Sequence, residues 1–261
     1  MDEHRRYRER RIEAQKRARA ARKRRRIKIA AACGAALCAA VGIGVFAGNS
    51  LFSEGDMAVD TMASVSTESN EAAAADQSLE ATSSIPELLA AMIQQSDNES
   101  YNELVRLESA DQSFSDGCHI LNDYLETAGY TYTRIYHTLS PSATESESIS
   151  DIQNHTSVED CGAILEKIYE GTCISQEASE EMLELLLGQQ TVTKIPAGLP
   201  EGVEVANKTG ETEESQHDAA IIFGEETDYI LCVMSAEWSV SSQAVETIQT
   251  ISQAVYEYLN M

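Results

Sequence analysis

Two polar clusters, Ser96-Asp97-Asn98 and Lys208-Thr209-Gly210, stand out because each directly follows an apolar stretch of the sequence. Only five Lys or Arg residues follow position 28, and one of them, Lys208, ends the strand-like run 203–208. A lysine ammonium beside a hydroxyl group can hold an anion or influence the proton of a neighbouring serine. Ser, Asp and Asn also favour turns and helix caps, so the first cluster has a purely structural interpretation as well.

Regular elements are predicted on both sides of each cluster. Helices are expected from a capping box at Ser84–Glu87 to Gln95, around 101–105, around 120–125 before Gly129, from a capping box at Thr156–Glu159 to Ile168, over 176–189 and over 241–259. Strand-like runs lie near 203–208, 218–223 and 229–235. Helices first, then three antiparallel strands and a closing helix, predict an α+β fold.

The S-D-N and K-T-G tripeptides, in that order and 112 residues apart, carry a resemblance to a known family. With the capped helix before the first and the strand before the second, residues 84–261 resemble class A β-lactamases and penicillin-binding proteins. The resemblance implies a β-lactamase-like serine hydrolase fold and, as ligands, β-lactams or peptides that end in D-Ala-D-Ala, as in peptidoglycan. No cofactor is expected, and the histidines and cysteines form no metal-binding motif.

The resemblance also implies a role for each motif residue. Ser96 would relay a proton to the leaving nitrogen, and Asn98 would contact the substrate amide or a catalytic lysine. Lys208 would be the cation beside the reacting serine, and Thr209 would help to hold the substrate carboxylate. Gly210 would let the strand backbone approach the acyl group. Catalytic roles therefore fall on Ser96 and Lys208, and substrate-binding roles on Asn98, Thr209 and Gly210.

The third signature of the family is Ser-x-x-Lys, in which the nucleophilic serine lies one helical turn before a lysine. It belongs before Ser96, but the sequence has no lysine between Lys28 and Lys167. The one later match, Thr191 to Lys194, is expected to be a surface turn. The nucleophile is therefore absent from the stretch where the resemblance requires it.

Two further parts of the family's site depart from the pattern. The glutamate that hydrolyses the acyl-enzyme is expected near 136–153, where Glu145 and Glu147 lie without an E-x-x-N spacing. The strand after K-T-G has no arginine for a substrate carboxylate. Instead, glutamates surround the K-T-G strand, and unpaired carboxylates repel an anionic ligand over roughly 8–10 Å. They are Glu201, Glu204, Glu211, Glu213 and Glu214.

The N-terminal part of the chain has the opposite charge to the rest. Residues 1–28 carry 14 Arg or Lys against four acids, whereas the remaining residues have a net charge of −34. Residues 29–48 are uncharged and long enough, at about 1.5 Å per residue, to cross a bilayer as a helix. A basic flank places the N-terminus in the cytoplasm. The pattern predicts a single-pass anchor in the cell membrane; a cleaved signal peptide and a nucleic-acid-binding arm are the alternatives, and no nucleic-acid partner is expected.

The chain is therefore divided into a basic arm (1–28), an anchor (29–48), an acidic Ser/Thr-rich linker (49–83) and an extracytoplasmic β-lactamase-like domain (84–261). The linker composition is typical of disorder. Four cysteines lie in the domain, and both buried free thiols and two disulfides are compatible with their positions. They are Cys118, Cys161, Cys173 and Cys232.

The predicted sheet has about three strands, fewer than the five of the family. The family places two strands before its nucleophile helix, and residues 49–84 are too few for both strands and that helix. The strand at 229–235 would then have an open edge, which invites pairing. Two partners are expected for it: residues 57–65, which alternate weakly with period two, or another chain in a homo-oligomer.

Three functional hypotheses follow. The first is an envelope binding or structural module without hydrolytic activity, a pseudoenzyme, because S-x-x-K is missing; its ligand would be peptidoglycan or a β-lactam-like molecule. The second is a β-lactamase or transpeptidase-type serine hydrolase, because S-D-N and K-T-G are present. The third is a truncated relative of an active enzyme without a function of its own. Whether the chain is an enzyme stays open at this point.

Overall fold

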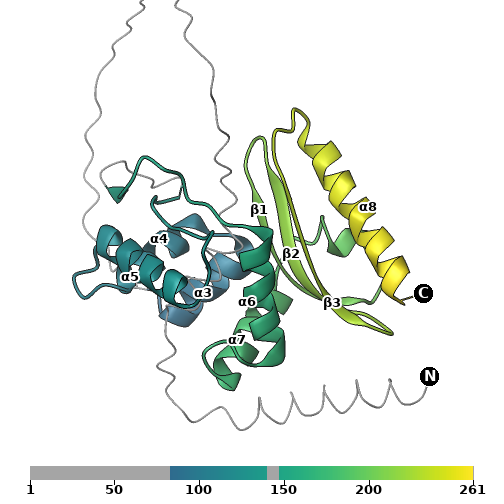
Figure 1. The fold of residues 1–261 in the computed structure, drawn as a ribbon, viewed down its shortest axis with the longest axis horizontal. Coiled ribbons are helices and arrows are strands. Elements are labelled where there is room, and N and C mark those ends of the chain that lie inside the picture. Colours follow the sequence, from purple (N-terminus) through teal and green to yellow (C-terminus); the bar gives the residue numbers. More distant parts are fainter. Residues whose placement is uncertain (1–82, 140–146, 261) are drawn as a thin grey trace, which may run out of the picture.

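A computed structural model describes residues 83–139 and 147–260 of the 261-residue chain. The predicted arm (1–28), anchor (29–48), most of the linker and the segment 57–65 lie outside these residues. Within the described part, no helix has the length and apolar character needed to cross a membrane. The described chain runs through five helices, a three-stranded sheet and a closing helix (Figure 1).

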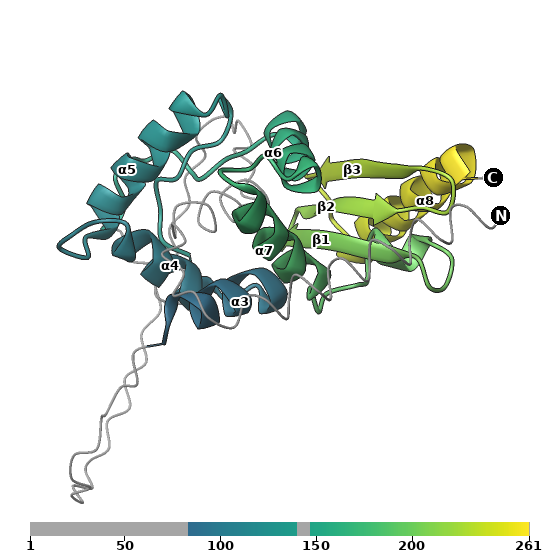
Figure 2. The same cartoon turned by 90° about the horizontal axis from the view of Figure 1, so that it is seen from below.

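Three helices, α3 (Ile85–Gln95), α4 (Asn98–Leu107) and α5 (Phe114–Thr127), pack against one another in chain order. The capping box at the start of α3 is confirmed, because the backbone N–H of Ser84 donates to the Glu87 carboxylate at 2.8 Å. α4 and α5 approach each other closely at Gly117, where even a Cβ atom would collide with the backbone carbonyl of Val105. This helical part lies to one side of the sheet (Figure 2).

Two helices, α6 (Val158–Glu170) and α7 (Gln176–Leu187), lie between the first three helices and the sheet (Figure 2). α6 packs on β2 and β3, and α7 packs on β1. The predicted capping box at Thr156 is wrong by one residue. Ser157 caps α6 by accepting a hydrogen bond from the backbone N–H of Asp160 at 3.1 Å, and the Thr156 hydroxyl instead lies 2.8 Å from that of Thr133.

The sheet contains β1 (Glu204–Glu211), β2 (Gln216–Phe223) and β3 (Asp228–Ser235), antiparallel and in the order β1-β2-β3. The register places Lys208 opposite Ala219 and Thr209 opposite Asp218. The predicted three-stranded antiparallel sheet and the α+β class are confirmed. β1 is longer than expected and continues through Gly210, so K-T-G lies inside the strand.

The last helix, α8 (Ser241–Asn260), covers the opposite face of the sheet together with the short 3₁₀ turn η3 (Pro196–Gly198) (Figure 1). Helical spacing in the sequence predicts that Val245, Ile248, Ser252, Val255 and Leu259 share its buried face, and this prediction is displaced by one residue at three of the five positions. The buried positions follow an i, i+4 spacing, whereas Val245, Val255 and Leu259 lie half-buried beside them. The buried residues are Ala244, Ile248, Ser252, Tyr256 and Asn260.

Apolar side chains form two cores, one on each face of the sheet. The larger core joins all the helices from α3 to α7 to one face, and the smaller joins α8 and Ile195 to the other. Alternate residues of β2 point into the two cores, Ala219 and Ile221 into the larger, Ala220 and Ile222 into the smaller. The four cysteines of the domain are free thiols. Burial raises the pKa of the Cys161 thiol to about 12, so it behaves as a small apolar side chain.

Candidate functional site

Ser96 and Asp97 form the sharp turn between α3 and α4. Ser96 ends α3 in the left-handed region, with φ 57° and ψ 39°. Asp97 starts α4, and its carboxylate accepts a hydrogen bond from the backbone N–H of Ser100 at 2.7 Å. The structural interpretation of this cluster is therefore correct for Asp97, which caps a helix. The chain changes direction sharply at this turn, and the Ser96 hydroxyl can therefore form a hydrogen bond with another element of the fold.

That element is β1, and the contact is made by Lys208. The Lys208 ammonium donates to the Ser96 hydroxyl at 2.6 Å and to the backbone carbonyl of Thr209 at 2.6 Å. The lysine residue is only 2% exposed, so its charge is largely removed from water. The two motifs, 112 residues apart, are thus joined directly by a charge-assisted hydrogen bond.

A small hollow of about 30 Å³ lies at this contact. It has room for roughly one water molecule, whereas pockets that bind small molecules measure about 300–1,000 Å³. One wall is Leu139, held in place by Asn102, whose buried amide donates to the Leu139 carbonyl and accepts from its N–H. The lining residues are Met92, Ser96, Asp97, Asn98, Tyr101, Leu139 and Lys208.

Asp218 lies on β2 directly opposite Thr209 and is 1% exposed. Its carboxylate accepts hydrogen bonds from the Asn207 amide at 3.0 Å and from the backbone N–H of Ile195 at 2.9 Å. Burial raises the pKa of Asp218 to about 6, although these hydrogen bonds and the charges of Lys194 and Lys208 act in the opposite direction. The carboxylate ties the loop before β1 to the sheet.

Lys194 is buried, so the expectation that Thr191–Lys194 forms a surface turn is wrong for the lysine, although Val192 and Thr193 are exposed. The lysine is 1% exposed, and its ammonium donates to the backbone carbonyls of Gly210 and His217 at 3.1 and 3.2 Å. It also forms an ion pair with Glu211 at 3.2 Å. Glu211 is therefore not one of a ring of unpaired carboxylates, and a second cation lies beside the K-T-G segment.

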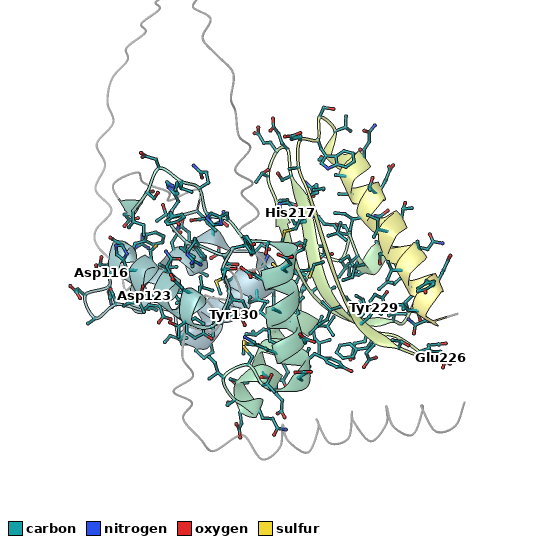
Figure 3. All side chains as sticks on the ribbon, viewed as in Figure 1. Asp116, Asp123, Tyr130, His217, Glu226 and Tyr229 are labelled. Atoms are coloured by element: carbon teal, nitrogen blue, oxygen red, sulfur yellow. The ribbon has the colours of Figure 1, made fainter. Side chains whose placement is uncertain are left out.

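His217, the residue directly before Asp218 on β2, pairs with Gly210 of β1 and is 4% exposed. Its Nδ1 atom accepts a hydrogen bond from the backbone N–H of Ser235 at 3.2 Å. Figure 3 shows His217 in the sheet near the end where β1 turns into β2. This contact joins the K-T-G strand, through β2, to the last residue of β3.

The polar loop near 136–153 is fastened by side chains at both ends. Glu147 accepts two hydrogen bonds from Arg106 at 3.0 and 2.9 Å. The Ser148 hydroxyl lies 2.6 Å from Nδ1 of His137. Glu147 is therefore engaged by a guanidinium rather than directed at the hollow, and Glu145 lies outside the described residues.

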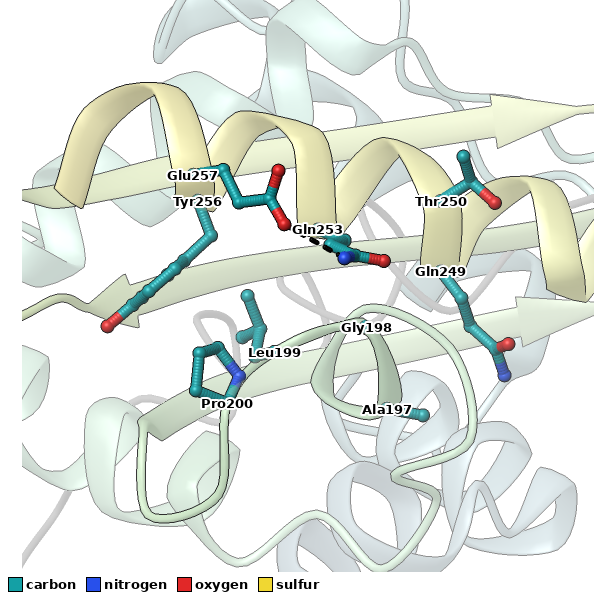
Figure 4. A pocket seen from close by; sticks show the side chains of 9 residues that line it. All are labelled: Ala197, Gly198, Leu199, Pro200, Gln249, Thr250, Gln253, Tyr256 and Glu257. Atoms are coloured by element: carbon teal, nitrogen blue, oxygen red, sulfur yellow. Dashed lines mark hydrogen bonds between the residues drawn. The ribbon is translucent and has the colours of Figure 1, made fainter. Parts of the chain in front are cut away.

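A larger hollow, of about 460 Å³, lies elsewhere, between η3 and α8 (Figure 4). The lining of this hollow includes Leu199, Pro200 and Tyr256, with Gln253 donating to Glu257 at 2.9 Å. Because α8 covers the face of the sheet opposite to α6 and α7, this hollow is separate from Ser96 and Lys208. Within residues 83–139 and 147–260, no group of His, Cys, Asp and Glu side chains is arranged to hold a metal ion.

The fold of the described residues is shared with solved structures of class A β-lactamases and of PBP-A. The match to the model of the β-lactamase enzyme family covers residues 50–259, and the chain belongs to this family. No curated protein sequence matches the chain.

Solved structures share the fold at low sequence identity. PBP-A is 24% identical over 66% of this chain and 60% of its own, with a TM-score of 0.54. A β-lactamase from Sphaerobacter thermophilus is 21% identical over 67% of this chain and 63% of its own, with a TM-score of 0.57. An ancestral class A β-lactamase is 22% identical over 69% and 68%, with a TM-score of 0.57. The chain thus spans about 60% of the length of PBP-A.

The structure brings Ser96, Asn98 and Lys208 to one hollow and places Thr209 and Gly210 next to them on β1, while their catalytic and binding roles stay predictions. Three buried polar residues behind the strand were missed by the sequence analysis: Lys194, Asp218 and His217. The sequence does contain one indication that Asp218 is buried, because this residue directly precedes the apolar run 219–223. A charged residue next to a fully apolar strand segment needs a partner.

Proposed function

We propose that this chain is a membrane-anchored, extracytoplasmic member of the β-lactamase family that lacks hydrolytic activity and serves as a binding or structural module of the cell envelope. Its ligand class is the one that the family's motifs suit, peptidoglycan peptides or β-lactam-like molecules. PBP-A supports this ligand class, because one of its structures is an acyl-enzyme with penicillin G.

The observation that carries the proposal is the closed contact between Lys208 and Ser96. The ammonium is already satisfied by the Ser96 hydroxyl and the Thr209 carbonyl, and the hollow beside it is about 30 Å³. A ligand would have to displace these hydrogen bonds and open the hollow at least about tenfold to be enclosed. This arrangement is better suited to holding the Ser96 turn against β1 than to binding a substrate and converting it.

One feature of the sequence and one of the structure also support a chain without hydrolytic activity. No serine before Ser96 has a lysine three residues later, so the chain offers no activated nucleophile at the place that the family uses. In the described part of the loop near 136–153, the Glu147 carboxylate accepts two hydrogen bonds from Arg106 and is therefore engaged away from the hollow. Acylation would lack its usual nucleophile, and Glu147 is not placed to assist deacylation.

Covalent labelling with a fluorescent penicillin tests the proposal. The purified chain is expected to give no band that survives boiling in denaturant, because no serine is activated for attack on the lactam carbonyl. An active penicillin-binding protein labelled in parallel shows that the reagent works. A stable fluorescent band from this chain would establish acyl-enzyme formation and contradict the proposal.

Binding without reaction is expected in a co-sedimentation assay with purified peptidoglycan. Lys208→Met is expected to reduce the sedimented fraction several-fold, because it removes the buried cation from the site. Lys167→Met is the matched control: its ammonium lies 4.5 Å from the centre of the Tyr130 ring and donates to the Ala128 carbonyl, outside the hollow. Equal sedimentation of both variants would argue against the site as the binding surface.

The second candidate is a β-lactamase or transpeptidase-type serine hydrolase. The observation that favours it is the direct contact between the S-D-N serine and the K-T-G lysine, whose hydroxyl oxygen and ammonium nitrogen are 2.6 Å apart. The labelling experiment separates the two candidates, because only the hydrolase forms a covalent adduct.

The membrane topology is part of the proposal, and it is supported by the basic residues 1–28 beside the uncharged residues 29–48. Protease added to intact cells is expected to remove the domain and to leave the N-terminal arm protected. Permeabilised cells serve as the control, since the arm should then be cut as well. A domain that stays protected in intact cells would reverse the topology.

A further inference from the structure

The hollow of about 460 Å³ between η3 and α8 lies on the face of the sheet opposite to α6 and α7. Its volume is in the range of about 300–1,000 Å³ that is usual for small-molecule sites, unlike that of the hollow at the S-D-N turn. One wall is formed by the turn η3 and the two residues after it. The other wall is one flank of α8, whose lining residues recur at helical spacing. They are Gln249, Thr250, Gln253, Tyr256 and Glu257.

The two walls of this hollow are held together by contacts within the chain. The Ser252 hydroxyl, which is 0% exposed, donates to the Ile195 carbonyl at 2.8 Å, and the Gln249 amide donates to the Thr193 carbonyl at 2.8 Å. Gly198 lies so close to α8 that a Cβ atom would collide with the backbone carbonyl of Gln249. The hollow is therefore already formed in the folded chain, and a ligand does not have to order its walls.

The polar groups of the α8 wall are mainly hydrogen-bond acceptors. The Gln253 amide nitrogen donates to Glu257 at 2.9 Å, and the Thr250 hydroxyl donates to the Glu246 carbonyl at 2.8 Å. The amide nitrogen of Gln249 is likewise engaged outside the hollow. These bonds do not use the side-chain oxygens of the two glutamines or the second oxygen of the Glu257 carboxylate. The lining thus suits a ligand that donates several hydrogen bonds.

The charge of the lining favours a cation. Glu257 lies in the lining, and Glu201, which is exposed, directly follows the lining residue Pro200. Only five Lys or Arg residues follow position 28, and none of them is among the residues that line the hollow. Lys194, which precedes η3, is 1% exposed and already donates to two backbone carbonyls of the sheet. An anionic ligand would therefore be repelled here, and a positively charged one attracted.

The hollow also offers apolar surface for the body of such a ligand. Tyr256 is 5% exposed and belongs to the smaller core, and Leu199 packs against that core. Figure 4 shows Tyr256, Leu199 and Pro200 toward one end of the hollow and Gln249 toward the other. An aliphatic stem can pack on such surface while its charged head meets acceptor oxygens. A tyrosine ring also attracts a cation that lies over its face.

We propose that the hollow between η3 and α8 binds an organic cation, namely an ammonium or guanidinium group on an aliphatic stem. The head group donates to the oxygens of Glu257 and Gln253, and the stem lies against Leu199 and Tyr256. A lysine or arginine side chain of a peptide and a free polyamine share this chemistry. The site is on the far side of the sheet from Lys208, so the inference does not depend on the proposed function.

Titration of the full chain, followed through amide NMR shifts, tests the proposal with three probes. Nα-acetyl-lysine amide and spermidine are expected to give saturable shifts at Leu199 and Gln253, with a dissociation constant of about 1 mM or tighter. Nα-acetyl-norleucine amide has the stem without the ammonium and should give no saturable shift. Tighter binding of the lysine amide would identify a peptide side chain as the source, and tighter binding of spermidine a free polyamine.

Two substitutions in α8 separate this site from general attraction to an acidic domain. Glu257→Gln keeps the size of the side chain and removes its charge, so it is expected to weaken binding of the lysine amide at least about fivefold. Glu246→Gln removes the same charge from the same helix outside the lining, and should weaken binding by less than about twofold. Both carboxylates are exposed, so neither variant should lower the melting temperature.

The proposal fails in three cases. In the first, neither cation gives saturable shifts at the hollow. In the second, Glu257→Gln and Glu246→Gln weaken binding equally, which would mean that the cation is attracted by the acidic domain as a whole. In the third, the norleucine amide binds as tightly as the lysine amide, which would make this an apolar site without a role for charge.

Discussion

Replacing Gly117 with alanine is expected to lower the free energy of unfolding by about 3 kcal/mol or more, since inserted atoms in a packed interface cost 1–3 kcal/mol and here the obstacle is backbone. The new Cβ would be directed at the carbonyl group of Val105, with the carbonyl carbon only 2.8 Å away. A side chain could rotate away, but this group belongs to α4, so α4 and α5 must separate. For a domain of this size the melting temperature should fall by roughly 6–12 °C.

Gly162→Ala is the matched control within the same protein. Gly162 lies in α6, and a Cβ added there meets no atom within 4 Å. Alanine favours a helix over glycine by about 0.5–1 kcal/mol, so this variant should melt slightly higher than the parent chain. Thermal unfolding followed by circular dichroism measures both. Equal effects of the two substitutions would show that the close approach of α4 and α5 is not a constraint.

The substitution Asp218→Asn is expected to change how stability depends on pH. Burial raises the folded-state pKa of Asp218 to about 6 from the usual 3.8, so the folded protein binds this proton more tightly than the unfolded chain. The parent chain should therefore lose stability from this group as pH rises from about 4 to about 6. The difference of about two pKa units corresponds to about 3 kcal/mol. The asparagine variant lacks this loss.

The quantity to measure is the difference in unfolding free energy between Asp218→Asn and the parent chain at pH 4 and at pH 7. It is expected to shift by about 3 kcal/mol in favour of the variant at the higher pH. Taking the difference removes the contributions of groups common to both proteins. Glu204→Gln, an exposed carboxylate at the start of β1, controls for the loss of one negative charge. A shift of the opposite sign would mean that Lys194 and Lys208 outweigh burial at Asp218.

Local signals in the sequence were sufficient for the fold of residues 84–260. The order of helices and strands was correct because capping boxes, helical spacing and alternating strand residues are read over a few neighbouring positions. The three-stranded sheet followed from counting the residues available before Ser84. The pairing of Ser96 with Lys208 was implied by the family motifs, and no property of either tripeptide alone would have brought them together.

Long-range burial was the part that could not be predicted. Lys194 was expected on the surface because lysine is rarely buried, and its partners, the carbonyls of Gly210 and His217, lie on strands 16 and 23 residues later. The displaced stripe of α8 has a similar cause. Tyr256 is buried in place of Val255 because the sheet face, and not hydrophobicity alone, determines which side of the helix is covered. The choice of Ser157 over Thr156 as the cap of α6 depends on Thr133, a residue 23 positions away from Thr156.

The left-handed backbone of Ser96 bears on whether the site is a relic. A non-glycine residue in this conformation costs roughly 1 kcal/mol, and glycine would avoid the cost. Glycine would relieve this strain, but it would also remove the hydroxyl that accepts a hydrogen bond from the Lys208 ammonium at 2.6 Å. The lysine is only 2% exposed, and a buried charged donor that loses a partner costs about 1–3 kcal/mol or more, which exceeds the strain. Folding alone therefore favours a serine at this turn, and a serine in the left-handed conformation is what a relic of the family's site would retain.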